Sequence, residues 1–187
     1  TPALVASAAN PEAFEQRFLE TFAGGELPVL QLTSEEEQYF ATARAATLDL
    51  VTAVDGAIIE AETQADRVPA DELAAQLAGQ VFAAMDAFHE ELSDARSPAS
   101  TQPQHDALLD AAATFAAQEE IYLDTLATAA PPEPVGVDEF FGIFFGAMET
   151  ADLASPFDAF EAACADLELA AYGLGATDGI CLTDGSS

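Results

Sequence analysis

The chain consists largely of segments in which apolar residues recur every three or four positions, which is the spacing of one face of an α-helix. One such stripe runs from Tyr39 to Ile58, and we expect the helix around it to extend from Ser34 to about Gln64. Ser34 and Glu37 have the spacing of a capping box, which predicts that the helix begins at this serine. Runs in which Val, Ile and Thr alternate with polar residues, which would indicate β-strands, are almost absent.

Further helical stripes follow the first. A stripe over residues 73–92 begins after a break near Pro69, and another over 108–126 follows a loop rich in proline and small polar residues. We expect the second of these stripes to form one continuous helix that starts near Gln104. The sequence PPEPVG at 131–136 ends it, because proline cannot continue the helical hydrogen-bond ladder.

The C-terminal part adds a helix that starts at Asp138, is interrupted at residues 155–157 and continues as a last helix to about Gly173. At the other end of the chain, Asn10 and Pro11 precede phenylalanines at 14, 18 and 22, which predicts a short helix followed by a linker. Together these segments predict an all-α antiparallel bundle of four to five helices. We expect a single domain over 1–187, in which residues 1–33 pack on a bundle core formed by 34–187.

The amino-acid composition agrees with a helical protein and excludes some classes of binding partner. Alanine, the best helix former, supplies more than a fifth of the chain, and half of all residues are hydrophobic, which is enough for one sizeable core. The chain has 34 acidic residues against four arginines and no lysine, for a net charge of −30. Since Lys and Arg supply most of the affinity for phosphates, we expect no binding to nucleic acid or to an anionic membrane surface.

The acidity has two ordinary explanations, and neither implies a specific cation site. One is adaptation to salt, with hydrated carboxylates on every helix, and the other is drift in an alanine-rich genome of high GC content. No apolar run is long enough to span a membrane as a helix.

The only two cysteines, Cys164 and Cys181, lie near the C-terminus. A disulfide between them would close a loop of about 18 residues, stabilise the fold by about 3 kcal/mol in the chain-entropy model, and pin the C-terminal tail. The alternative is two unrelated buried thiols, whereas a zinc site would need further ligands at spacings that are absent. We expect the disulfide, and with it an oxidising compartment outside the cytoplasm.

The most hydrophobic stretch is FFGIFFGAM, residues 140–148. Its candidates for an interaction surface or a ligand pocket are Phe140, Phe141, Phe144, Phe145 and Met148. Gly142 and Gly146 have the spacing that permits close contact between helix backbones. We expect this segment to be the central helix of the core, surrounded on all sides, and the alternative is a docking surface for a partner or a ligand.

Two histidines and one glutamate complete the candidate polar residues. His89 and Glu119 each fall on an apolar stripe, which makes them candidates for a buried polar pair; the alternative places them at the bundle edge. A carboxylate metal centre would need two Glu-x-x-His motifs and two more glutamates, so we expect no metal. His105 comes just before a predicted helix, and we expect it to be exposed or to cap that helix.

Motifs that carry catalysis are missing from the sequence. The nucleophile elbow G-x-S-x-G, the zinc motif H-E-x-x-H, a phosphate-binding glycine loop and the EF-hand ladder all fail to match. Paired acids are frequent, but with 34 acidic residues their pairing carries no information. We therefore expect a protein that is not an enzyme and that needs no cofactor.

Features of the C-terminal half resemble a known kind of protein. A proline-containing loop leads into HDALL at 105–109, prolines stop the helix at 131–132, and FEAAC ends at Cys164 before Gly175 and Cys181. In these features the chain resembles uncharacterised secreted or lipid-anchored helical-bundle proteins of high-GC bacteria. The resemblance implies an extracytoplasmic bundle with a C-terminal disulfide and no established activity.

The sequence therefore predicts a secreted or cell-surface bundle that acts by binding or as a structural component. The alternative is a small-molecule carrier or sensor with an apolar pocket between helices near residues 140–148. The partner would be a protein or a small molecule, and the pattern is compatible with an oligomer.

Overall fold

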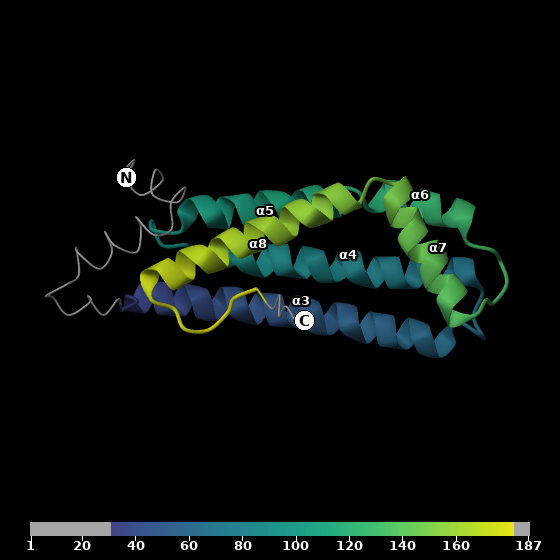
Figure 1. Ribbon diagram of the computed structural model, residues 1–187, viewed down its shortest axis with the longest axis horizontal. Coiled ribbons are helices and arrows are strands. Elements are labelled where there is room, and N and C mark those ends of the chain that lie inside the picture. The colour runs from purple at the N-terminus through teal and green to yellow at the C-terminus, as the bar shows by residue number, and fades with distance from the viewer. Residues whose placement is uncertain (1–30, 182–187) are drawn as a thin grey trace, which may run out of the picture. The chain divides into compact units, whose positions relative to one another are not determined.

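The two longest apolar stripes form the helices α3 (Ser34–Gln64) and α4 (Ala70–Asp94), which pack side by side in opposite directions (Figure 1). The computed structural model describes residues 31–181, so the helix predicted over 10–23 lies outside the described residues. All regular secondary structure within that range is α-helical. The fold class predicted from the periodicity is confirmed.

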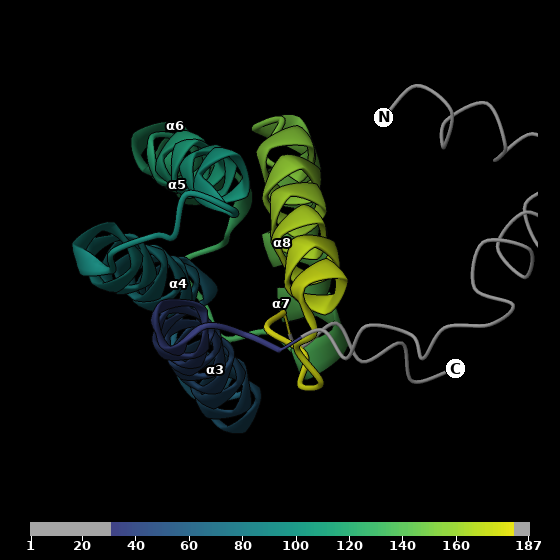
Figure 2. The same cartoon turned by 90° about the vertical axis from the view of Figure 1, so that its left-hand side faces the viewer.

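Four more helices follow in the chain: α5 (Gln102–Ala116), α6 (Glu119–Ala129), α7 (Val137–Thr150) and α8 (Ala154–Leu174). α5 packs beside α4, α8 lies along α5, and α8 hardly touches α3. Seen from one end, α3, α4, α5 and α8 lie around a common centre (Figure 2). The first and last of these helices, α3 and α8, therefore have little direct contact with each other.

The loop between α6 and α7 closes one end of the bundle through backbone hydrogen bonds. The amides of Ala70 and Asp71 donate to the carbonyl oxygens of Glu133, at 3.0 Å, and Pro131, at 3.1 Å. Amides in the first turn of a helix have no partner inside the helix, and Pro69, the residue before α4, provides no side-chain cap. The proline-rich loop therefore caps α4, which fixes the end of α6 against the turn between α3 and α4.

The first turn of α3 is capped one residue earlier than the sequence predicts. Thr33 Oγ1 accepts a hydrogen bond from the amide of Glu36 (3.3 Å), and Glu36 Oε2 accepts one from the amide of Thr33 (2.8 Å). Glu36 Oε1 also accepts a hydrogen bond from the hydroxyl of Ser100, in the loop after α4, at 2.8 Å. This tertiary contact favours Glu36 over Glu37, so the predicted box from Ser34 to Glu37 is wrong by one residue.

The stripe over 108–126 forms two helices rather than the one continuous helix predicted. The break lies at Ala117 and Gln118, where the amide of Gln118 donates to the carbonyl of Phe115, three residues back, at 3.0 Å. The rings of Phe115 in α5 and Tyr122 in α6 then both contact Phe82 of α4, with centroids 5.3 Å and 6.0 Å from it. The tighter turn is thus coupled to a tertiary contact, which apolar spacing alone does not reveal.

The break before the last helix also differs from the prediction at residues 155–157. The chain turns at 151–153, where Asp152 has a left-handed φ of 52° and the amide of Leu153 donates to the carbonyl of Met148 (2.9 Å). Pro156 lies instead in the first turn of α8, where its missing amide costs no helical hydrogen bond. The predicted interruption is therefore the start of α8.

Candidate functional site

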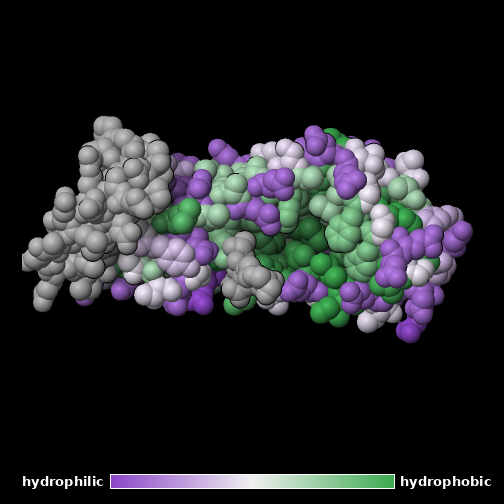
Figure 3. Space-filling view, in the orientation of Figure 1, coloured by the Kyte–Doolittle hydropathy of each residue, from purple (hydrophilic) through white to green (hydrophobic). Residues whose placement is uncertain are grey.

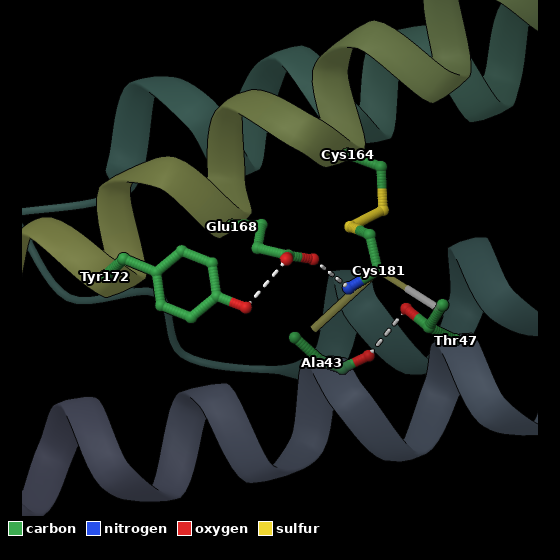
Figure 4. The surroundings of a disulfide bond; sticks show 6 residues. All are labelled: Ala43, Thr47, Cys164, Glu168, Tyr172 and Cys181. Carbon is green, nitrogen blue, oxygen red and sulfur yellow. Dashed lines mark hydrogen bonds between the residues drawn. A yellow bond between two sulfur atoms is a disulfide. The ribbon is translucent and has the colours of Figure 1, made fainter. Parts of the chain in front are cut away.

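The predicted disulfide is confirmed. Cys164 of α8 is bonded to Cys181, with a sequence separation of 17 and 5.9 Å between the two Cα atoms. Both cysteines are buried. The bond fixes residues 175–181, here called the return loop, through Cys181, which lies between α8 and α3 (Figure 4).

Other interactions hold the return loop from the α8 side. Gly175 adopts a left-handed φ of 107°, which ends α8 and turns the chain back. The amide of Cys181 donates to Glu168 Oε2 at 2.9 Å, and the hydroxyl of Tyr172 donates to Glu168 Oε1 at 2.9 Å (Figure 4). The side chain of Ile180 is buried, so the loop is packed as well as hydrogen-bonded.

The return loop also reaches α3. Arg44 of α3 forms an ion pair with Asp178 of the loop, with 3.1 Å between Nη1 and Oδ2. Both side chains are largely exposed, so the pair contributes little to stability, but it marks where the loop meets the helix. In Figure 4, Cys181 lies close to Thr47 of α3. The loop therefore links two helices that hardly touch each other directly.

An apolar cleft of about 270 Å³ lies between α3 and α8, and it is called the α3–α8 cleft below. Its walls come from α3 and α8 and its floor from α4 and α5, and in Figure 3 hydrophobic side chains gather in the middle of this face between hydrophilic ones. The lining residues are Thr47, Leu50, Val51, Val54, Asp55, Val81, Met85, Phe115, Phe157, Phe160, Glu161, Cys164 and Cys181.

The α3–α8 cleft has different residues at its two ends and few polar side chains. Because α3 and α8 run in opposite directions (Figure 1), Thr47 and Cys164 line one end of the cleft, and Asp55 and Phe157 line the other. The Thr47 hydroxyl donates to the carbonyl of Ala43 at 2.9 Å, so it is already satisfied within its helix. Asp55 and Glu161 are exposed, and among the described residues they are the only ionisable side chains that line the cleft. The interior of the cleft is therefore mainly apolar, and its rim is acidic.

The phenylalanine-rich segment forms most of α7 and does not line the α3–α8 cleft. Phe140 and Phe144 are buried, Phe141 and Met148 are partly buried, and Phe145 is 52% exposed. The expectation of a helix surrounded on all sides is therefore wrong. Because α7 lies at one end of the bundle, only one of its faces is covered by other helices (Figure 1).

The two glycines of α7 do not serve close helix contact. A Cβ atom added at Gly142 or Gly146 would meet no atom within 4 Å. Both glycines instead line an open groove of about 630 Å³ between α6 and α7, together with Ile121 and Ile143. The inward face of α7 is held by the hydroxyl of Tyr122, which donates to the carbonyl of Phe144 at 2.9 Å.

His89 and Glu119 do not form the buried pair that the sequence suggested. Each side chain is only partly buried, and no hydrogen bond between them occurs among the described residues. The helical stripes placed each residue on an inward face separately, but the stripes carry no information about the distance between two helices.

A buried polar pair does occur elsewhere, between Tyr39 of α3 and His105 of α5. The Tyr39 hydroxyl lies 3.0 Å from His105 Nδ1, and His105 is only 4% exposed, so the expectation that it is exposed or capping is wrong. Burial lowers the pKa of His105 below its ordinary value of 6.5 and raises the pKa of Tyr39 to about 12. Both side chains are therefore uncharged at neutral pH. The two residues are 66 positions apart in the sequence, so no local sequence pattern could have predicted this pair.

Among residues 31–181, no helix is both long and apolar enough to cross a membrane. No cluster of three His, Cys, Asp or Glu side chains that could hold a metal ion is found in the same range. Comparison of the chain with protein-family models, curated proteins and solved structures gave no match. The α3–α8 cleft is therefore the basis for inferring function.

Proposed function

We propose that this protein binds the apolar part of a small molecule in the α3–α8 cleft and does so outside the cytoplasm. The observation that carries the proposal is the cleft itself, which has aliphatic and aromatic walls and a volume of about 270 Å³. Small-molecule sites are usually concave, mostly apolar and provided with a few polar groups, which is the pattern seen here.

The position of the cleft changes the carrier hypothesis without removing it. The sequence suggested a pocket near residues 140–148, whereas the apolar cleft is lined by none of them. The groove that does reach this segment, between α6 and α7, is open and includes Ile121, which is 53% exposed. The α3–α8 cleft is deeper in the fold, since Met85 and Phe115 at its floor are buried.

The disulfide supports binding because it sets the distance between the walls before any ligand arrives. Cys164 belongs to the α8 wall, and Cys181 belongs to a loop that is ion-paired to α3. A site that is already ordered loses less conformational entropy when it binds, so its affinity is higher for the same contacts. We infer that the return loop holds the cleft open.

The chemistry of the lining favours binding over catalysis. Within residues 31–181, Thr47 has the only hydroxyl that lines the cleft, and it donates to the backbone of its own helix. No histidine lines the cleft, so the Thr47 hydroxyl has no imidazole there that could accept its proton and activate it as a nucleophile. The two carboxylates lie at the exposed rim, where they suit orientation of a ligand.

The location outside the cytoplasm rests on the disulfide, because such bonds persist in oxidising compartments and are rare in the cytosol. Intact mass after thiol alkylation in denaturant, with and without prior reduction, tests its state in protein isolated from its source under acid quench. We expect no label before reduction and two labels after it. Two labels without reduction would remove the argument for this location.

Binding is tested by isothermal titration of the purified protein with 1-octanol, a neutral probe of suitable size. We expect saturable binding to the wild type and at least tenfold weaker binding to Val54→Phe, whose larger side chain fills the cleft from α3. Ile59→Phe is the matched control, since Ile59 is on the same helix, is 60% exposed and does not line the cleft. Absence of saturable binding to the wild type, or equal binding to Val54→Phe, contradicts the proposal.

A second candidate function, self-association, is favoured by the exposed apolar surface of α6 and α7. Phe145 and Ile121 are 52% and 53% exposed, and such surfaces often mark interaction sites. Sedimentation velocity of the wild type and of Phe145→Ser tests it. A concentration-dependent dimer that the substitution removes would support this role, and a monomer at all concentrations would exclude it.

A further inference from the structure

The charges around the α3–α8 cleft are of one sign. Asp55 on the α3 wall and Glu161 on the α8 wall are both exposed at its rim, and none of the arginines in the described part of the chain lines it. The chain has no lysine and only four arginines. Of the three arginines in the described residues, Arg44 pairs with Asp178, Arg67 with Asp66 and Arg96 with Glu35.

We propose that the ligand of the α3–α8 cleft is a cationic amphiphile, with a short apolar body in the cleft and a positively charged group at the rim formed by Asp55 and Glu161. This inference rests on the proposed function and specifies its ligand class. An anionic head, such as the carboxylate of a fatty acid, would meet two like charges and no cation. A cationic head would meet opposite charges on both walls.

An aromatic ring at the rim adds a second attraction for a cation. Phe157 precedes Glu161 by one helical turn on α8, so the two side chains lie on the same face. Phe157 is 39% exposed, and its ring is 6.2 Å from that of Phe115, which anchors it to the floor of the cleft. The face of an aromatic ring attracts ammonium groups, and the attraction increases as the cation loses water.

The volume of the cleft sets the size of the apolar body. A water molecule occupies about 30 Å³ in the liquid, so a cleft of about 270 Å³ has room for roughly nine non-hydrogen atoms. An octyl chain fits this volume, so three probes that carry such a chain or a nearly equal one can be compared: octyltrimethylammonium, 1-octanol and octanoate. They carry alkyl chains of nearly the same length and differ in the head group, which is cationic, neutral or anionic.

The test is titration of the full chain with the three probes at low and high salt. We expect octyltrimethylammonium to bind at least about tenfold more tightly than 1-octanol, and octanoate to bind most weakly. The difference between the cation and the alcohol should shrink at about 1 M salt, where the Debye length falls to about 3 Å. Attraction to the net charge of the whole protein would also be screened, so a second comparison is needed.

Charge-matched variants separate the rim from the general acidity of the protein. In Asp55→Asn/Glu161→Gln we expect the preference for the cation to disappear while 1-octanol still binds. Glu90→Gln/Asp110→Asn removes two exposed carboxylates that do not line the cleft, and it should keep the preference.

The outcomes distinguish the two proposals. If 1-octanol binds but the cation binds no more tightly, or if both double variants behave alike, the inference about charge is wrong and the apolar site stands. If none of the three probes binds, both the proposed function and this inference fail.

Discussion

The backbone amide of Cys181 donates a hydrogen bond to the carboxylate of Glu168, with 2.9 Å between the nitrogen and Oε2. Glu168 is one helical turn beyond Cys164 on α8, so consecutive turns of that helix hold Cys181 by a covalent bond and by a hydrogen bond. Cys181 lines the α3–α8 cleft, and its position therefore sets one end of the proposed binding site.

Loss of the disulfide should destabilise the protein. In Cys164→Ser/Cys181→Ser we expect the free energy of unfolding to fall by about 2–4 kcal/mol, because the unfolded chain regains the freedom of a loop of about 18 residues. Urea unfolding followed by circular dichroism measures the change. Wild type in reducing agent should behave like the variant, and a change below about 1 kcal/mol in both would show that the bond constrains little.

Replacement of the carboxylate that holds Cys181 should have a smaller effect. Glu168→Gln keeps one acceptor oxygen for two donors, the amide of Cys181 and the hydroxyl of Tyr172, and it removes the charge that strengthens both bonds. We expect a loss of about 1 kcal/mol in urea unfolding. Asp166→Asn, at an exposed position on the same helix, is the control and should change stability by less than about 0.5 kcal/mol.

The neutral, buried His105 predicts a contribution to stability that depends on pH. Burial lowers its pKa in the folded state below 6.5. Between that lowered pKa and pH 6.5, the unfolded chain therefore binds a proton at this histidine that the folded chain does not bind. Stability from this group is therefore complete above about pH 6.5 and is lost as the pH falls toward the lowered pKa. The difference in unfolding free energy between wild type and His105→Gln should decrease through this window, and a constant difference would contradict it.

Glu36 should act in a more acidic window. Its hydrogen bonds, first from the Thr33 amide and then from the hydroxyls of Ser100 and Thr33, lower its pKa below the ordinary 4.5. The stability it contributes is present above pH 4.5 and is lost as the pH falls through the lowered pKa. Glu36→Gln should therefore be less stable than the wild type at neutral pH, and the difference should disappear in acid. Thermal unfolding at a series of pH values measures it.

The net charge predicts a dependence on salt. With a charge of −30 the folded chain repels itself, and ions that screen this repulsion should stabilise it. We expect the melting temperature to fall sharply when the protein is diluted from about 1 M salt into a dilute buffer. Sucrose at matched osmolality is the control, and a melting temperature that does not move with salt would count against salt adaptation.

The helices of this protein could be predicted because apolar spacing is a local property. The stripes over 39–58 and 73–92 predicted α3 and α4 closely, and the prolines at 131–132 ended α6 as expected. Errors occur where a tertiary contact chooses between local alternatives. The hydrogen bond from Ser100 favours Glu36 over Glu37 as the glutamate of the capping box, and Phe82 contacts rings on both sides of the break at Ala117.

The candidate site was predictable only in part. The disulfide followed from two cysteines placed at a helix and in the loop behind it, but the cleft beside it did not. Its walls come from α3 and α8, which are far apart in the sequence and carry ordinary apolar stripes. The phenylalanines of α7 drew attention because they are dense in the sequence, although they lie elsewhere in the bundle.

The amino-acid sequence by itself determined the helical class, the acidic surface, the positions of most helix ends and the disulfide. These depend on residue type and on spacings within one segment, which short-range hydrogen bonding and burial decide. Only the tertiary structure decided that α8 lies along α5 and away from α3, that His105 is buried against Tyr39, and that an apolar cleft with an acidic rim lies between the first and last long helices. Such arrangements depend on how all the helices pack together. The apolar face of one helix could be buried against several others, and only the packing of the whole chain selects which one.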